Sequence, residues 1–424
     1  MKLVITREKL YATLILLPYI EGNFIQNIFD VYINNNAAIK AIVFFLIVAI
    51  YFFSVIVFSK TVLAKNSLEN RYYNVMLFSF TIISFLFVLL LASDLIVSFC
   101  VWLWLCVPIL FACSAVAFCR LLNLNITNIF LYMVRYFTVY IIIALFYYVL
   151  FRGLFVDTTV RFAPRGGGAV IFGYTMALIF ALTLHVKDSF KKFEYYLILT
   201  VLTIGVFGTL SRGAVWMVLF CWFANFVLGN LNRKKVVFFT SLMVVLFLFA
   251  NIDFEAIFSS TSFIGVDRLL NLNSFRRVET VLNILEFVKS LPLFERLFGL
   301  GLGNFFPYMY WWINIHDVLT NEFSYNGFMF LVQPHNSFLY LILETGFLGF
   351  IIILSVIVVS IQKLYVNREN CFIFQMLFFG VFIVSNLLDS VFFVQPGTSS
   401  SFWLLALLVV ERHFQVTGRE ISCG

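Results

Sequence analysis

The hydrophobic positions of this chain form long continuous blocks, and short stretches that carry the charged residues separate one block from the next. A helix that crosses a bilayer needs roughly 20 mostly apolar residues, and most of the blocks reach that length. We therefore predict about twelve transmembrane helices. They lie near residues 8–24, 38–58, 72–92, 95–118, 136–151, 168–186, 193–209, 212–230, 234–251, 336–361, 371–390 and 399–412.

Composition supports this interpretation and excludes a soluble protein. The chain of 424 residues is 62% hydrophobic, contains 56 phenylalanines and has only 12% charged residues, which is too little polar surface to cover a soluble globule. A transmembrane β-barrel is excluded as well, because its strands alternate between apolar and polar residues. The predicted fold class is an all-α polytopic membrane protein, with residues 1–424 as a single integral membrane domain.

Lysine and arginine concentrate in alternate short loops, which predicts the orientation of the chain. The loop with Lys187, Lys191 and Lys192 and the loop at residues 233–235 are examples, and the loops between them hold few cations. Because short cytoplasmic loops carry the excess of positive charge, we expect both termini in the cytoplasm. These loop lysines and arginines account for most of the net charge of +7. We therefore do not interpret the charge as a nucleic-acid-binding surface and expect no nucleic-acid partner.

Residues 252–334 form one long loop on the outer side, between predicted helices nine and ten. A loop of this length in a tightly connected chain is usually functional. Val278, Val281, Leu282, Leu285 and Val288 recur at helical spacing, which predicts an amphipathic helix on or near the membrane surface. The glycine-punctuated turn GLGLGNF follows at 299–305; no predicted strand precedes it, which argues against a nucleotide-binding loop.

Four arginines on the outer side need an explanation, because charge at a membrane is costly. Arg161 and Arg165 flank a short glycine-rich loop, Arg212 lies at the turn between predicted helices seven and eight, and Arg277 belongs to the loop helix. A guanidinium binds a phosphate through two parallel hydrogen bonds, so the set suggests a phosphate or pyrophosphate ligand. The alternative for each arginine alone is contact with lipid headgroups.

The stretch QPHNSFLYLILETGFLGF, residues 333–350, places His335 and Asn336 at the outer end of predicted helix ten. Gly346 and Gly349 are predicted to thin one face of this helix for close helix contact. An imidazole exchanges a proton near neutral pH, so His335 is a candidate general base, the alternative being a packing role. The outer side shows no Asp, Glu and His cluster at metal-ligand spacing, so we expect neither a metal nor a cofactor.

These residues form a pattern that resembles a known family. His335-Asn336, followed by Gly346-Phe347-Leu348-Gly349, resembles the signature of the O-antigen ligase and O-antigen polymerase superfamily of bacterial envelope glycosyltransferases. Residues 277–303 are similar to the segment before that histidine, and Ser211-Arg212-Gly213 resembles the recurrent Ser/Thr-Arg turn. The resemblance covers roughly residues 155–400. It departs at Val281, where many relatives carry tryptophan.

The resemblance implies an all-helical glycosyltransferase fold of the C class in the bacterial inner membrane, with its active site and the 252–334 loop facing the periplasm. It implies metal-independent, inverting transfer of a glycan from undecaprenyl pyrophosphate to an acceptor hydroxyl. His335 would be the base, and Arg212 with Arg161 or Arg165 would hold the pyrophosphate. Arg277 would position a lipid-linked substrate, and Asn336 would contact the substrate beside His335.

Three reactions remain as alternatives. A polymerase joins two lipid-linked glycans, and the phenylalanine content and the lack of a second long outer domain favour it. A ligase instead transfers the polymer to lipid A core. A flippase or transporter is the third alternative, although its usual internal repeats with broken helices are not visible. The expected partners are undecaprenyl-pyrophosphate-linked glycans and membrane lipid, and a polymerase would add a chain-length regulator.

Overall fold

The computed structural model describes residues 6–13, 68–154, 160–163, 169–228, 275–306, 322–331, 336–366, 372–388, 399 and 402–411. The chain divides into two compact units that each combine distant segments. Unit 1 comprises residues 1–30, 125–275 and 367–385, and unit 2 comprises residues 31–124, 276–366 and 386–424. The hydrophobic pattern alone does not predict this division. The predicted helices at 38–58 and 234–251 lie outside the described residues, so the number twelve stays a prediction.

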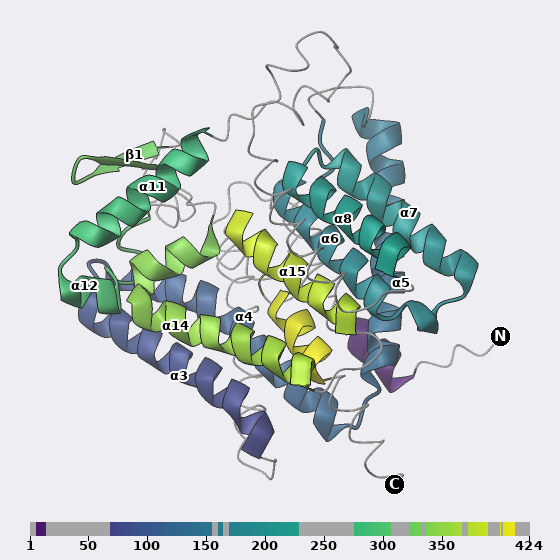
Figure 1. The fold of residues 1–424 in the computed structure, drawn as a ribbon, viewed down its shortest axis with the longest axis horizontal. Coiled ribbons are helices and arrows are strands. Elements are labelled where there is room, and N and C mark those ends of the chain that lie inside the picture. The colour runs from purple at the N-terminus through teal and green to yellow at the C-terminus, as the bar shows by residue number, and fades with distance from the viewer. Residues whose placement is uncertain are drawn as a thin grey trace. The chain divides into compact units, whose positions relative to one another are not determined.

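Unit 1 is built from helices that surround α6 (Figure 1). Residues Ile171–His185 of α6 are buried throughout, and α6 contacts three other helices of this unit. A helix that is apolar on every side belongs in the centre of a bundle. The elements are α5 (Ile126–Arg152), α6 (Ala169–His185), the short 3-10 helix η1 (Lys187–Ser189), α7 (Lys192–Gly208), α8 (Arg212–Leu228) and most of α15 (Phe372–Leu388).

Unit 2 is centred on the long helix α14, which packs against α3 and α12, while α3 also packs against α4. Gly346 interrupts α14 with a φ of 68° and a ψ of −176°, so that two helical segments meet there at a kink. The elements are α3 (Leu68–Leu91), α4 (Leu95–Leu121), α11 (Phe275–Ser290), α12 (Leu293–Phe298), β1 (Glu322–Tyr325), β2 (Phe328–Leu331) and α14 (Ser337–Val366). The helical residues 402–411 also belong to unit 2.

Strands β1 and β2 form an antiparallel hairpin that the all-α prediction lacks. Asn326 and Gly327 connect the strands with φ values of 49° and 82°, and a two-residue hairpin turn of type I′ requires positive φ at both positions. The hairpin packs on α11, where the Phe287 ring lies 5.6 Å from the Phe330 ring. The Asn-Gly pair was the signal for this hairpin in the sequence, and the other described elements are helices.

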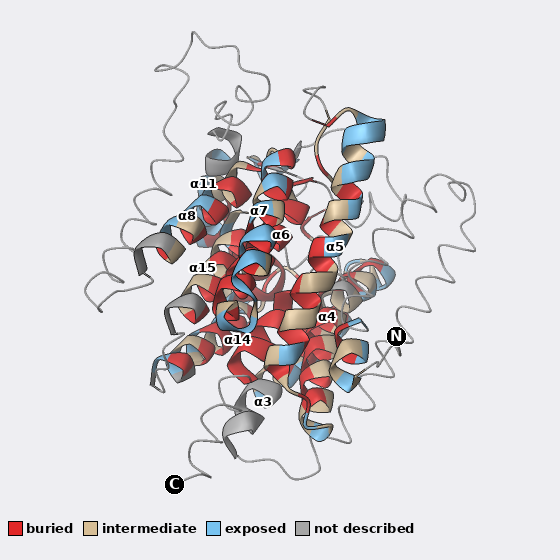
Figure 2. Cartoon of the chain, turned by 90° about the vertical axis from the view of Figure 1, so that its right-hand side faces the viewer, coloured by how far each residue is buried: buried red, intermediate tan, exposed pale blue. Residues whose placement is uncertain are grey.

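Three of the described helices are long and apolar enough to cross a membrane. They are Leu95–Leu121, Ile126–Arg152 and Ser337–Gln362. Helix α5 exposes an apolar stripe along its second half (Figure 2), which consists of Val139, Ile143, Phe146, Tyr147, Val149, Leu150 and Phe151. Such a stripe suits contact with lipid and would be costly in water. These helices indicate a helical membrane protein.

Helix α5 begins ten residues before the predicted position, because polar residues at its start still belong to the helix. Asn125 caps it, and its side-chain oxygen accepts a hydrogen bond of 3.3 Å from the backbone nitrogen of Asn128. Gly153 ends it in the left-handed conformation with a φ of 68°, as is common for a glycine after a helix. The predicted boundary at residue 136 was therefore wrong.

The predicted amphipathic helix of the long loop is confirmed as α11, but its buried face differs from the predicted one. Val288 is buried as predicted, whereas Leu282 is 56% exposed and Leu285 is 43% exposed. The buried face is instead formed by Thr280, Ile284, Phe287 and Val288, and Leu291, directly after the helix, is buried as well. Aromatic packing under the hairpin selects this face, and the pattern of aliphatic residues does not reveal it.

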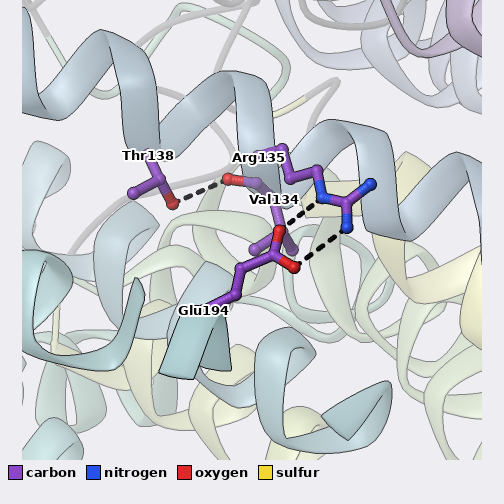
Figure 3. A network of polar contacts seen from close by, with 4 residues as sticks. All are labelled: Val134, Arg135, Thr138 and Glu194. Atoms are coloured by element: carbon purple, nitrogen blue, oxygen red, sulfur yellow. Dashed lines mark hydrogen bonds and ion pairs between the residues drawn. The ribbon is translucent and has the colours of Figure 1, made fainter. Parts of the chain in front are cut away.

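Ion pairs connect helices at the ends of the bundles. Arg135 of α5 donates to both carboxylate oxygens of Glu194 on α7, at 2.5 and 3.0 Å (Figure 3). The hydroxyl of Thr138, one turn further along α5, donates a hydrogen bond of 2.7 Å to the carbonyl of Val134. In unit 2, Arg120 of α4 pairs with Glu411. A bidentate guanidinium–carboxylate pair has a specific geometry, so it holds the two helices together and also restricts how far one can slide along the other.

Candidate functional site

The predicted site residues fall into the two units, and the structure describes four of the six at least in part. Arg161 and Arg212 belong to unit 1, while Asn336 and Arg277 belong to unit 2. Arg277 lies in the first turn of α11 as predicted, with only its backbone described. His335 and Arg165 lie outside the described residues, so their predicted roles stay predictions.

In unit 1 the structure brings Arg161 to the turn that carries Arg212. The Nε of Arg161 donates to the carbonyl of Thr209 at 2.9 Å, and its Nη2 makes a longer contact of 3.5 Å with the carbonyl of Leu210. These carbonyls lie at the end of α7, where a helix presents partial negative charge. Arg212 follows two residues later as the first residue of α8, and both arginines are partly exposed.

Arg161 is held in this position by its neighbours on both sides. The backbone nitrogen of Phe162 donates to the carbonyl of Gly208 at 2.7 Å, and the hydroxyl of Tyr148 donates to the carbonyl of Ala163 at 2.6 Å. The Phe162 ring is fully buried. It lies edge-on to the Tyr148 ring at 5.3 Å. Segment 160–163 is therefore held to the end of α7 by one interaction and to Tyr148 of α5 by two, and these contacts position the guanidinium of Arg161.

The turn between α7 and α8 is itself tightly built. Leu210 has a φ of 50°, and the Thr209 hydroxyl donates to Val206 and accepts from the backbone nitrogen of Ser211. Gly173 of α6 packs directly on this turn, since a Cβ at that position would lie 2.9 Å from both the Cβ of Ala214 and the hydroxyl oxygen of Thr209. The backbone that presents Arg212 is thus rigid.

The hydroxyl of Ser211 is buried without a hydrogen-bond partner, as are the hydroxyls of Ser98 and Ser399 among the described residues. The residue is 3% exposed and immediately precedes α8. A serine at this position usually caps the helix by accepting from a backbone nitrogen of the first turn. Here the partial positive charge of the helix start lies next to the side chain of Arg212, a combination that favours a bound anion.

In unit 2, Asn336 is the cap of α14. Its side-chain oxygen accepts hydrogen bonds of 3.0 Å from the backbone nitrogens of both Phe338 and Leu339. Its backbone carbonyl accepts from the nitrogen of Tyr340. The residue is 9% exposed, and the cap uses its oxygen, so the predicted substrate contact would have to come from the amide nitrogen. The cap also fixes the chain direction directly after His335.

Glu344 is a buried acidic residue that the sequence analysis did not single out. It lies in α14, is fully buried, and accepts hydrogen bonds from the backbone nitrogens of Gly303 and Phe306, the latter at 3.1 Å. An ionisable side chain inside a membrane helix usually marks a functional or structural centre. Here the partners come from the glycine-rich turn, so backbone groups that could cradle an anion are occupied by a carboxylate of the same chain.

The same turn docks on the kink of α14 through backbone contacts. The nitrogen of Leu300 donates to the carbonyl of Leu343 at 2.8 Å, and the nitrogen of Gly301 donates to the carbonyl of Glu344 at 3.2 Å. A Cβ on Gly299 would lie 2.5 Å from the backbone nitrogen of Gly346. Gly346 was predicted to allow close helix contact, and the structure shows such an approach: a Cβ there would collide with the carbonyl of Leu297 in α12 as well as with the nitrogen of Gly299 in this turn.

The turn also extends to the start of α4. The amide nitrogen of Asn304 donates to the carbonyls of Leu91 and Leu300 at 2.6 and 2.8 Å. Its amide oxygen accepts from the backbone and the hydroxyl of Ser93 at 3.0 and 2.7 Å. Asn304 therefore connects the α3–α4 turn to the glycine turn, and Glu344 connects the glycine turn to α14.

Comparisons with known proteins do not assign this chain to a family. No protein-family model matches it, and none of the curated proteins matches it.

Proposed function

We propose that this protein is a metal-independent, inverting glycosyltransferase that transfers a glycan from undecaprenyl pyrophosphate to a hydroxyl of a second lipid-linked glycan, as an O-antigen polymerase does. The single observation that supports it best is the position of Arg161 on the α7–α8 turn. Two arginines that the sequence analysis selected for pyrophosphate, 51 positions apart in the chain, meet at one rigid turn of unit 1.

The chemistry assigned to these groups is simple. The acceptor oxygen attacks the anomeric carbon and gives its proton to the imidazole of His335. The bond between the anomeric carbon and the pyrophosphate oxygen breaks, and undecaprenyl pyrophosphate leaves with the electron pair. Cationic groups that stabilise the developing charge on the leaving group lower the barrier, and this is the role proposed for Arg212 and Arg161. The cap of α14 restricts Asn336, which directly follows His335, and this supports the role proposed for His335.

The test has two levels. The first is the lipopolysaccharide ladder of a deletion strain, because each alternative leaves a different product. Loss of a polymerase leaves core with one repeat unit, loss of a ligase leaves bare core while lipid-linked polymer accumulates, and loss of a flippase accumulates single repeats at the inner face. A normal ladder would refute a role in this pathway.

The second level uses matched variants of the same chain. His335→Ala is expected to abolish polymer formation at normal protein level, while His316→Ala, in the same loop, leaves the ladder unchanged. Arg212→Lys keeps the charge but loses the paired geometry of a guanidinium, so polymer should fall strongly, whereas Arg152→Lys at the end of α5 should have no effect. Normal polymer in His335→Ala would remove the proposed base.

A further inference from the structure

Unit 1 contains a second polar feature, at the end of its helices opposite to the arginine turn. A pocket of about 330 Å³ is lined by Lys187, Tyr195, Tyr196, Trp222 and Asn225. Tyr195 lies in the first turn of α7 and Asn225 lies near the end of α8. At 1.5 Å per residue, Tyr195 is about 20 Å along α7 from Thr209. The pocket is therefore separate from the proposed pyrophosphate site.

The lining combines flat aromatic walls with polar groups. The Tyr195 and Tyr196 rings meet edge-on at 5.2 Å, and the Trp222 ring packs on Phe180 of α6 at 5.7 Å. The Tyr195 hydroxyl donates to the side-chain oxygen of Asn225 at 3.1 Å. This hydrogen bond uses the amide oxygen of Asn225 and leaves its amide nitrogen as a donor in a pocket that Lys187 also lines.

Local charge and residue type both point to a phosphate at a membrane interface. Residues 187–194 contain three lysines and two acids, and one of the acids, Glu194, is paired with Arg135. The other acid, Asp188, is exposed. Tyrosine and tryptophan are enriched at the level of lipid headgroups. Cationic groups on the cytoplasmic side attract anionic lipids, and the lysine distribution predicts that this end of unit 1 is cytoplasmic.

We propose that this pocket binds the phosphate group of an anionic membrane phospholipid, with the ammonium of Lys187 and the amide of Asn225 on the phosphate and the aromatic rings along the glycerol and upper acyl region. The volume equals that of roughly ten water molecules, which is sufficient for a phosphodiester headgroup. The site would bind lipid on the membrane side opposite to the proposed transfer reaction and does not depend on that reaction.

The test is native mass spectrometry of the full-length protein in detergent, titrated with phosphatidylglycerol or with phosphatidylcholine. We expect phosphatidylglycerol to bind more tightly, and we expect Lys187→Gln to weaken it about fivefold. Asn225→Asp keeps an acceptor for Tyr195 but places a negative charge in the pocket, so it should weaken binding at least as much. Lys192→Gln, an exposed lysine nearby that does not line the pocket, is the matched control and should bind like the wild type.

Each outcome decides the proposal. Equal weakening in Lys187→Gln and Lys192→Gln would mean diffuse surface attraction and would overturn it, as would equal binding of the two lipids by the wild type. Inorganic phosphate, added as a separate arm, distinguishes the source of the ligand. If it binds in place of the lipid with the same dependence on Lys187 and Asn225, the phosphate chemistry is upheld and its source is a soluble phosphate. The thermal unfolding temperature of Asn225→Asp is measured as a folding control, and a value equal to that of the wild type excludes a folding defect.

Discussion

Gly346→Ala should undock the glycine-rich turn from α14, and the structure sets the size of the effect. With a φ of 68° and a ψ of −176°, Gly346 occupies a region that is essentially restricted to glycine, and a side chain there costs about 1–3 kcal/mol. The added Cβ would also collide with the backbone carbonyl of Leu297 and the backbone nitrogen of Gly299. These are main-chain atoms, so no side-chain rotation can relieve the collision.

Relief requires the turn to move away, which breaks the hydrogen bond of 2.8 Å between Leu300 and Leu343 and the one of 3.2 Å between Gly301 and Glu344. At about 1 kcal/mol net for each bond, the loss together with the strain amounts to about 3–5 kcal/mol. The assay combines thermal unfolding in detergent with hydrogen exchange of the amides in 299–306. The variant should unfold at lower temperature, and these amides should exchange faster.

Gly380→Ala is the matched control for this prediction. Gly380 lies within α15, and a Cβ there would meet nothing within 4 Å. Alanine is favoured over glycine inside a helix by up to about 1 kcal/mol, so this variant should be neutral or slightly stabilised. If Gly346→Ala unfolds at the same temperature as Gly380→Ala and protects the turn amides equally well, the docking argument is refuted.

Two smaller effects follow from the caps and ion pairs. Asn336→Ala should destabilise the start of α14 by about 1 kcal/mol, and Asn336→Asp should restore it because a carboxylate also accepts from the first-turn nitrogens; equal loss in both variants, measured by thermal unfolding, would contradict the cap. A double-mutant cycle of Arg135→Ala and Glu194→Ala should give a coupling of only about 0.5–1 kcal/mol, since the side chains are 37% and 27% exposed, and a value above about 2 kcal/mol would contradict this reasoning.

The sequence by itself determined the helical membrane class, because hydrophobic block length is a local property that survives any arrangement of the helices. It also located most of the described helices, including α11 in the long loop, and it marked the Ser211-Arg212 turn. Two of its errors have different causes. The start of α5 was misjudged although its signal is local, since Asn125 caps the helix three residues before Asn128, whereas the buried face of α11 depends on a distant partner, the hairpin.

Only the tertiary structure decided which polar groups meet. Arg161 reaches Thr209 across 48 residues of sequence, and Glu344 reaches Gly303 across 41. No periodicity encodes such pairs, since they depend on how helices and turns pack. Glu344 gave one signal, an acid inside an apolar block, but its partners are backbone nitrogens that are present at almost every residue. Which of them turn toward the carboxylate is set by glycine conformations at 299–303 and 346, and these exist only in the folded chain.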